Sequence, residues 1–234
     1  MTGGSDAPTP VSGRRGGAQR IPRPPTIRLG PAAPWTTRPP ESRRLPLDEV
    51  RRRCRAFPAP ARPPRVPGNQ AAAVLVPLFE GGGETRVVLT RRPDTMPSHR
   101  GDVAFPGGKV HPEIDPTLLD AALREAEEEV GLPRAAVEVV AELDPISTVT
   151  SRFLVAPFVG VLAGEPELRP DPREVERVFD VALSELMADG VHRVEHWGTG
   201  VLTREVHIFE LEDETVWGLT ARILAGFLTL LTSL

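Results

Sequence analysis

Three glutamates within five residues are the groups in this chain best suited to chemistry. Glu125, Glu128 and Glu129 lie in the segment Arg-Glu-Ala-Glu-Glu-Glu-Val-Gly-Leu at 124–132. On a helix, positions i, i+3 and i+4 share one face, so the three carboxylates project together. Like charges at this spacing destabilise a helix, and the helix dipole disfavours anions near the C-terminus. A divalent cation would offset both penalties, because carboxylate oxygens are hard ligands suited to Mg²⁺ or Mn²⁺.

A pair of glycines, Gly107 and Gly108, precedes this acidic segment. Because glycine has no Cβ, the backbone can approach a ligand closely at both positions. Gly107 is therefore a candidate substrate contact, and the Gly108 carbonyl is a candidate ligand of the same cation. The alternative is that the acidic run is a solvated helix face on which Arg124 pairs with Glu128. The glycine pair favours the metal site over this alternative.

The glutamates are expected to lie on a helix at 116–130. Asp115 would cap this helix, Pro116 suits its first position and Gly131 ends it. Apolar periodicity and turn residues predict the other elements. These are strands at 71–79 and 86–90, which flank the glycines at 81–83 and are expected to form a hairpin, and further strands at 137–143, 153–162 and 201–210. Short helices are predicted at 174–178 and 183–188, and a closing helix at 220–231. Strands separated by helices in this order predict an α/β domain, with a mixed sheet sandwiched between helices.

Charge and proline content divide the chain near residue 70. Residues 1–70 hold 14 arginines against four acidic residues, together with 15 of the 27 prolines. This composition cannot bury enough apolar surface to offset chain entropy, so residues 1–44 are predicted to be a disordered tail. Residues 45–69 are predicted to form a short basic helix and a linker, and residues 70–234 the folded domain.

The composition also excludes several classes of protein. A single cysteine, Cys54, rules out an internal disulfide framework and a multi-cysteine metal site. The apolar C-terminal run is too short to cross a membrane and contains Arg222, and the N-terminus has no signal-peptide core. A soluble cytoplasmic protein with no membrane partner is expected. Trp35 stands alone in the basic tail, so no nucleic-acid partner is expected either.

The acidic segment and the glycine pair resemble the signature of the Nudix family, G-x5-E-x7-R-E-U-x-E-E-x-G-U, where U is aliphatic. Residues 124–132 match its second half, with Ala126 at the small apolar position. The first half departs, because two extra residues separate Gly108 from Arg124 and Pro116 stands where the signature has a glutamate. The family glutamate at that position is not expected to be a principal metal ligand.

A second motif is similar to that of the coenzyme A pyrophosphatases within the Nudix family. It comprises Leu-Thr-Arg-Arg at 89–92 and His-x-Gly-x-Val-Ala-Phe-Pro-Gly-Gly at 99–108. Ala-Leu-Arg-Glu-Ala at 122–126, Asp-Pro-x-Glu-Val at 171–175 and the Trp-Gly block at 216–224 are also similar to this branch. The chain has Asp102 where the branch commonly has glutamine and Pro97 where it has a basic residue. The resemblance spans about residues 70–232.

The resemblance implies a Nudix-like α/β/α sandwich and hydrolysis of a nucleoside diphosphate linked to another group. For coenzyme A, the products would be 3′,5′-ADP and 4′-phosphopantetheine. Glu125 and Glu129 would hold the main Mg²⁺ or Mn²⁺ ion, with Glu128 completing the site or binding a second ion. Arg124 would orient the glutamates by ion pairing. Glu174 is the candidate general base in a later loop, its alternative role being ordinary helix capping.

Arg92 and His99 are the candidate substrate contacts in the loop before the glycine pair, although His99 could be only a turn residue. Two other functions remain open. One is a Nudix hydrolase for another nucleotide, such as ADP-ribose or a dinucleotide, which Asp102 and Pro97 keep open. The other is a non-catalytic nucleotide-binding regulator, which the three clustered carboxylates disfavour. The expected partner is a small-molecule nucleotide, and a homodimer is a candidate assembly.

Overall fold

A computed structural model describes residues 16–61, 68–96, 98–148, 152–200 and 203–233 of the chain. The larger sheet contains β2 (Gln70–Gly81), β3 (Glu84–Arg91), β4 (Val103–Ala104), β5 (Gly107–Lys109), β6 (Val137–Glu142), β7 (Ile146–Ser147), β8 (Phe153–Leu162) and β9 (Arg177–Ala182). The smaller sheet contains β1 (Ile27–Leu29), β10 (His192–Trp197), β11 (Arg204–Glu210) and β12 (Thr215–Trp217). The α-helices are α1 (Leu47–Arg55), α2 (Leu118–Val130), α3 (Leu183–Leu186) and α4 (Gly218–Ser233), and the 3₁₀ helices are η1 (Pro34–Thr37), η2 (Pro40–Arg43) and η3 (Arg134–Ala136).

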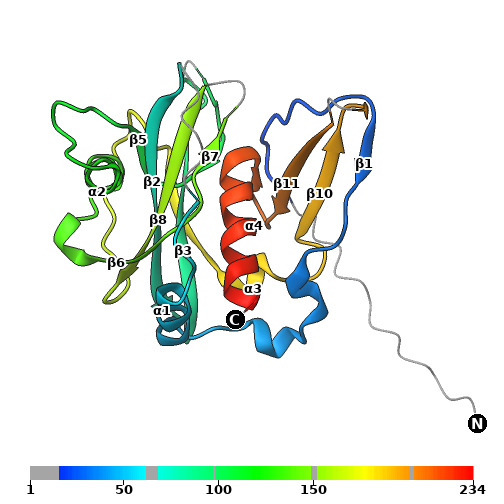
Figure 1. Cartoon of the computed structure of the whole chain (residues 1–234), viewed down its shortest axis with the longest axis horizontal. Helices are drawn as coiled ribbons and strands as arrows, with labels where there is room; N and C mark the ends of the chain where they lie inside the picture. Colours follow the sequence, from blue (N-terminus) through cyan, green and yellow to red (C-terminus); the bar gives the residue numbers. More distant parts are fainter. Residues whose placement is uncertain (1–15, 62–67, 97, 149–151, 201–202, 234) are drawn as a thin grey trace, which may run out of the picture.

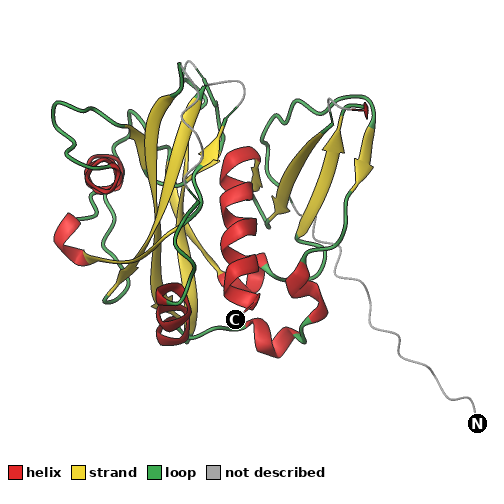
Figure 2. Cartoon of the chain, in the orientation of Figure 1, coloured by secondary structure: helices red, strands yellow, loops and turns green. Residues whose placement is uncertain are grey.

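The larger sheet is mixed, as the sequence predicts. Its main path runs β4-β3-β2-β8-β6, with β5 paired to β2, β7 to β8 and β9 to β3. The β2–β8 pair at its centre is parallel, whereas the other pairs in this sheet are antiparallel. The predicted hairpin is confirmed, because β2 and β3 flank Gly82 and Gly83, both of which have positive φ. Helix α2 covers one face of the sheet, and α1 and α4 lie on the other (Figures 1 and 2).

Helix α2 packs its small apolar face closely on this sheet. Ala121, Ala122, Ala126 and Val130 are completely buried against β2 and β8 residues. The helix begins at Leu118 rather than 116, and its cap is Thr117, which accepts a hydrogen bond from the Asp120 backbone in a capping box. The predicted cap at Asp115 is therefore wrong. Gly131 ends the helix in the left-handed conformation, as predicted.

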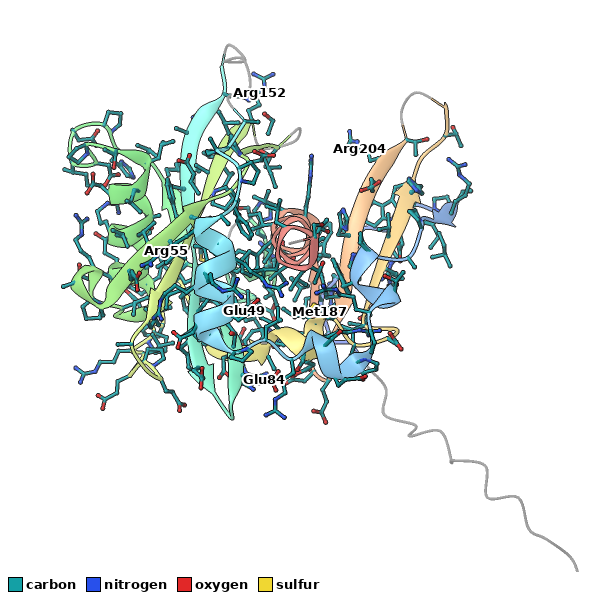
Figure 3. All side chains as sticks on the ribbon, turned by 60° about the horizontal axis from the view of Figure 1, so that its bottom comes forward. Glu49, Arg55, Glu84, Arg152, Met187 and Arg204 are labelled. Carbon is teal, nitrogen blue, oxygen red and sulfur yellow. The ribbon has the colours of Figure 1, made fainter. Side chains whose placement is uncertain are left out.

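Helix α4 lies between the two sheets, which is visible end-on in Figure 3. Its buried side chains occur around most of its circumference, including Ala221, Leu224, Phe227 and Leu228. A helix that is apolar on more than one face is stable where it is covered on more than one side. The smaller sheet therefore adds a fourth layer to the α/β/α sandwich. No helix among the described residues is both long and apolar enough to cross a membrane.

The predicted disordered tail is wrong for residues 16–44. Trp35 in η1 is 1% exposed and stacks on Phe209 of β11, with ring centroids 6.4 Å apart. The Arg43 guanidinium, also buried, donates to the Met187 carbonyl at 2.8 Å and to Asp189 at 2.7 Å. Residues 16–30, which we call the N-terminal strap, cross the smaller sheet and end as its edge strand β1. The buried side chains of Trp35 and Arg43, together with backbone pairing of β1 to the smaller sheet, offset the loss of chain entropy on folding. Composition alone predicts that this entropy loss would keep the segment disordered.

Residues 1–15 of the predicted tail, and residues 62–67 of the predicted linker, lie outside the described residues. The short basic helix between them is confirmed as α1, whose Leu47, Val50 and Cys54 are buried. The predicted helix at 174–178 is wrong: residues 172–174 form a turn, and β9 begins at Arg177. This difference places Glu174 on a loop rather than in a helix.

Candidate active site

The glutamates of α2 line a pocket of about 220 Å³ together with a later loop. Its lining residues are Glu125, Glu128, Glu129, Asp171, Arg173 and Glu174. Glu129 is buried, the Glu125 side chain is 13% exposed and the Glu128 side chain is 60% exposed. The three carboxylates therefore share one side of the helix but differ in depth, with Glu129 at the bottom of the pocket.

The glycine pair contacts the two deeper glutamates. The Gly107 backbone N–H donates to Glu129 Oε2 at 3.1 Å. A Cβ at Gly108 would lie 2.6–2.8 Å from the carboxyl atoms of Glu125, so a side chain there would displace that carboxyl. A Cβ at Gly107 would lie 2.4 Å from the Ala73 carbonyl oxygen of β2. Strand β5 can lie between β2 and α2 because both positions lack a side chain.

The pocket raises the pKa values of its two deeper carboxyls. Burial raises the pKa of Glu129 to about 8, opposed by the Gly107 hydrogen bond and reinforced by the Glu125 charge. Burial also raises the pKa of Glu125, against the pull of Arg124. Arg124 and the Gly107 N–H compensate only part of this desolvation, because both pKa values remain raised, so the carboxylate donor set fits a hard divalent cation. Among the described residues, no three Asp, Glu, His or Cys side chains already surround one ion position.

Arg124 is fixed by several acceptors rather than by Glu128 alone. It donates to Asp115 at 2.9 and 3.0 Å, to Glu125 at 2.9 Å and to Glu128 at 2.8 Å. Its hydrogen bonds to Asp115, with a smaller contribution from the His111 backbone, hold the pKa of that buried carboxyl below its ordinary value. Sequence reasoning assigned Asp115 to the helix cap and missed this contact.

The loop that carries Glu174 is docked on the C-terminal end of α2. The backbone N–H groups of Arg169 and Asp171 donate to the carbonyls of Val130 and Glu129, both within 2.9 Å. Glu174 is close enough that its charge contributes to the raised pKa values of Glu125 and Glu129, after burial and nearer charges. The structure therefore brings Glu174 to the carboxylate pocket, together with Asp171, which sequence reasoning did not single out as a site residue.

Arg91 and Arg92 are neighbours with different surroundings. Arg91 lies 3.5 Å from Glu176, 3.6 Å from Glu214 and 3.9 Å from Asp94. Arg92 forms no ion pair with any described residue, and its buried Nε, like that of Arg91, has no hydrogen-bond partner among them. Its guanidinium is the uncommitted cation of this pair.

The charge of Arg92 acts on both the pocket and the loop. The pKa of Glu129 is raised, mainly by burial, and the positive charge of Arg92 reduces this rise. The pKa of His99 is raised, mainly by its hydrogen bond to Asp102, and the charge of Arg92 reduces this rise as well. Arg92 therefore lies within electrostatic reach of both groups. His99 itself does not line the carboxylate pocket; its side chain is 64% exposed. Pro97, the other departure in this loop, lies outside the described residues.

Comparisons with known proteins assign the class. The NUDIX domain family matches residues 69–198. The chain is 40% identical to the uncharacterized Nudix hydrolase NudL of Photorhabdus laumondii over 157 residues, covering 67% of this chain and 82% of that protein. It is 38% identical to NudL of Yersinia pestis over 157 residues, covering 67% of this chain and 77% of that one. The chain belongs to the NUDIX domain family, which confirms the resemblance of residues 124–132.

Among solved structures, the MutT/nudix family protein from Enterococcus faecalis is similar, with a TM-score of 0.46 at 20% identity. The alignment covers 71% of this chain and 63% of that one. Nudix hydrolases act on nucleoside diphosphate derivatives and generally use divalent metals such as Mg²⁺ or Mn²⁺. The chain is thus a Nudix hydrolase, and its pocket of acidic side chains fits the metal that this class uses.

Proposed function

We propose that this Nudix hydrolase cleaves the diphosphate of coenzyme A or its derivatives to 3′,5′-ADP and 4′-phosphopantetheine. The observation that carries the proposal is Arg92, an uncommitted guanidinium within electrostatic reach of Glu129 and of His99. Such a group can bind the phosphate that coenzyme A carries in addition to its diphosphate, because guanidinium binds phosphate through two parallel hydrogen bonds. The motif at 89–108 supports the same substrate.

Glu125 and Glu129 are the proposed ligands of the main Mg²⁺ or Mn²⁺ ion. Glu128, at the mouth of the pocket, completes the site or holds a second ion, and the Gly108 carbonyl is a further oxygen ligand. When bound, the metal neutralises phosphate charge and lowers the pKa of the attacking water. Binding requires the carboxylates to adjust, because they do not yet surround one ion position.

The other residues position these groups and handle the proton. Arg124 orients Glu125 and Glu128 and is itself fixed by the buried Asp115. Glu174, on the loop docked against α2, is the proposed general base. It would accept a proton from the water whose oxygen bonds to one phosphorus of the diphosphate, while the bond from that phosphorus to the bridging oxygen breaks and the other phosphate leaves. The Gly107 backbone, which lies beside Glu129, is a proposed substrate contact. Arg92 and His99 are the proposed contacts for the additional phosphate.

A panel of substrates, assayed with Mg²⁺ and with Mn²⁺, tests this proposal. The panel contains coenzyme A, 3′-dephospho-coenzyme A, ADP-ribose and a diadenosine polyphosphate. We expect the highest kcat/KM for coenzyme A, with products cleaved at the diphosphate. Faster hydrolysis of ADP-ribose or of the dinucleotide would assign the chain to another Nudix substrate. Nucleotide binding without hydrolysis of any compound would favour the non-catalytic regulator.

A further inference from the structure

The loop 99–102 is held in a costly backbone conformation. His99 has φ of 55°, in the left-handed region that non-glycine residues rarely adopt. Gly101 follows with φ of 64°, and the Asp102 backbone N–H donates to the His99 carbonyl at 3.3 Å. Such a conformation persists where surrounding contacts fix it, so the contacts of this loop show which of its side chains is held in a fixed orientation.

Asp102 divides its two carboxylate oxygens between two partners. Oδ1 accepts a hydrogen bond from Trp217 Nε1 at 2.9 Å, and Oδ2 lies 3.1 Å from His99 Nδ1. An ionised carboxylate only accepts hydrogen bonds, so the proton of this second bond lies on Nδ1 of the imidazole. The ring of the exposed His99 is therefore fixed through Nδ1, which leaves Nε2 free of this bond.

Trp217 is itself positioned by the smaller sheet. It pairs with Ile208 of β11, and its ring stacks on that of Trp197, with ring centroids 6.2 Å apart. The Trp197 indole donates to the buried Glu195 at 2.8 Å. Gln19 of the N-terminal strap donates to the Gly101 carbonyl at 3.2 Å and thereby holds the other side of the loop. The loop is thus held by residues from outside the larger sheet.

The charged groups around His99 belong to its own loop and to the end of β3. Asp102 raises the pKa of His99 through their hydrogen bond, and Arg92 lowers it through its charge. Asp94 and Arg91 approach the neighbouring Gly101. With the Asp102 contribution the larger, His99 carries more positive charge near neutral pH than an isolated histidine does.

We propose that Asp102 is a positioning residue that, anchored by Trp217, orients His99 so that its Nε2–H binds a phosphomonoester on the substrate. Asp102 is one of the departures from the branch motif, where glutamine is common. A neutral amide at this position would orient the ring but would not stabilise the positively charged imidazolium. Because the aspartate does stabilise it, the hydrogen bond from His99 to an anion is strengthened. The inference rests on the proposed function for the identity of the phosphate. It is tested separately through His99 itself.

The first measurement is the NMR titration of His99 in the full chain without substitutions and in its Asp102→Asn variant. The variant keeps an acceptor for Trp217 and has nearly the same shape. We expect the pKa of His99 to fall in Asp102→Asn, because the carboxylate that stabilises imidazolium is gone. The matched control is Asp94→Asn, which removes an exposed carboxylate from the same loop without a bond to His99. A His99 pKa that is the same in Asp102→Asn and the full chain would overturn the proposal.

The second measurement is the ratio of the dissociation constants of AMP and 3′,5′-ADP, taken by calorimetry at pH 7. The two probes differ by one phosphomonoester. We expect Asp102→Asn to reduce the preference for 3′,5′-ADP about tenfold, the size of a charge-assisted hydrogen bond. Trp217→Phe, which keeps a ring for stacking but loses the indole donor, should reduce it less, and Asp94→Asn should leave it unchanged.

A fall in the pKa of His99 without any change in this ratio would overturn the substrate part of the proposal, because His99 would then be oriented but idle. Neither measurement requires turnover. If the full chain hydrolyses ADP-ribose faster than coenzyme A while both expected changes occur, the proposed function fails and this inference stands.

Discussion

The two sheets of this protein differ in what they contribute to the site. The larger sheet and α2 carry the carboxylates, the glycine pair and Arg92. The smaller sheet lines no part of the carboxylate pocket, yet its Trp217 and the strap residue Gln19 hydrogen-bond the loop that carries His99. With the roles proposed above, the difference indicates a division of work, in which one region would hold the metal for hydrolysis and the other would position the loop proposed to contact the substrate.

The largest effect is expected from the carboxylates of α2. Replacing Glu129 or Glu125 with Gln should lower kcat by more than about 100-fold, since even outer-shell changes around a metal cost 10- to 100-fold. The control is Glu127→Gln, an exposed neighbour on the same helix that does not line the pocket. Steady-state kinetics in excess Mg²⁺ measures the effect. Near-normal turnover by both single variants would remove α2 from the chemistry.

The next largest effect concerns the region that composition suggested was disordered. Trp35→Ala should destabilise the folded chain by about 3–5 kcal/mol, the usual cost of truncating a buried aromatic side chain. Denaturant unfolding measures this, and Thr37→Ala, in the exposed part of η1, is the control. An unchanged midpoint in Trp35→Ala would mean that residues 16–44 do not pack in solution.

A smaller effect is expected where Arg124 is anchored. Asp115→Asn should lower kcat by about tenfold, because the neutral amide holds the guanidinium that orients Glu125 less firmly. The folded pKa of Asp115 is lowered, so its stabilising contribution is present at neutral pH and is lost as the pH falls through that lowered value. The difference in melting temperature between the variant and the full chain should therefore shrink in acid. A constant difference from pH 7 to pH 3 would contradict the pairing.

The sequence was informative where local pattern and chemistry coincide. Periodicity and turn residues predict the acidic helix and the hairpin. The close approach of the backbone at 107–108 to the glutamates follows from the absence of side chains at Gly107 and Gly108. It was uninformative where long-range pairing decides the outcome. Nothing local indicates that Trp35 would stack on Phe209, or that Arg177–Ala182 would pair with β3 as a strand.

The candidate site shows the same limit. Glu125, Glu128 and Glu129 were found by their spacing, and Glu174 by the resemblance. Asp115 was missed because a residue just before a helix fits a cap equally well. The role of Asp102 could not be read from the sequence, because its partner Trp217 lies 115 residues away.

The most direct test of the proposed substrate is the preference of the enzyme for coenzyme A over 3′-dephospho-coenzyme A. We predict a higher kcat/KM for coenzyme A in the full chain, and a loss of about tenfold in this preference in Arg92→Ala, with smaller change in turnover of the dephosphorylated compound. Arg100→Ala, which removes another guanidinium from the same loop, should keep the preference. Equal efficiency of the full chain on the two compounds would contradict the account.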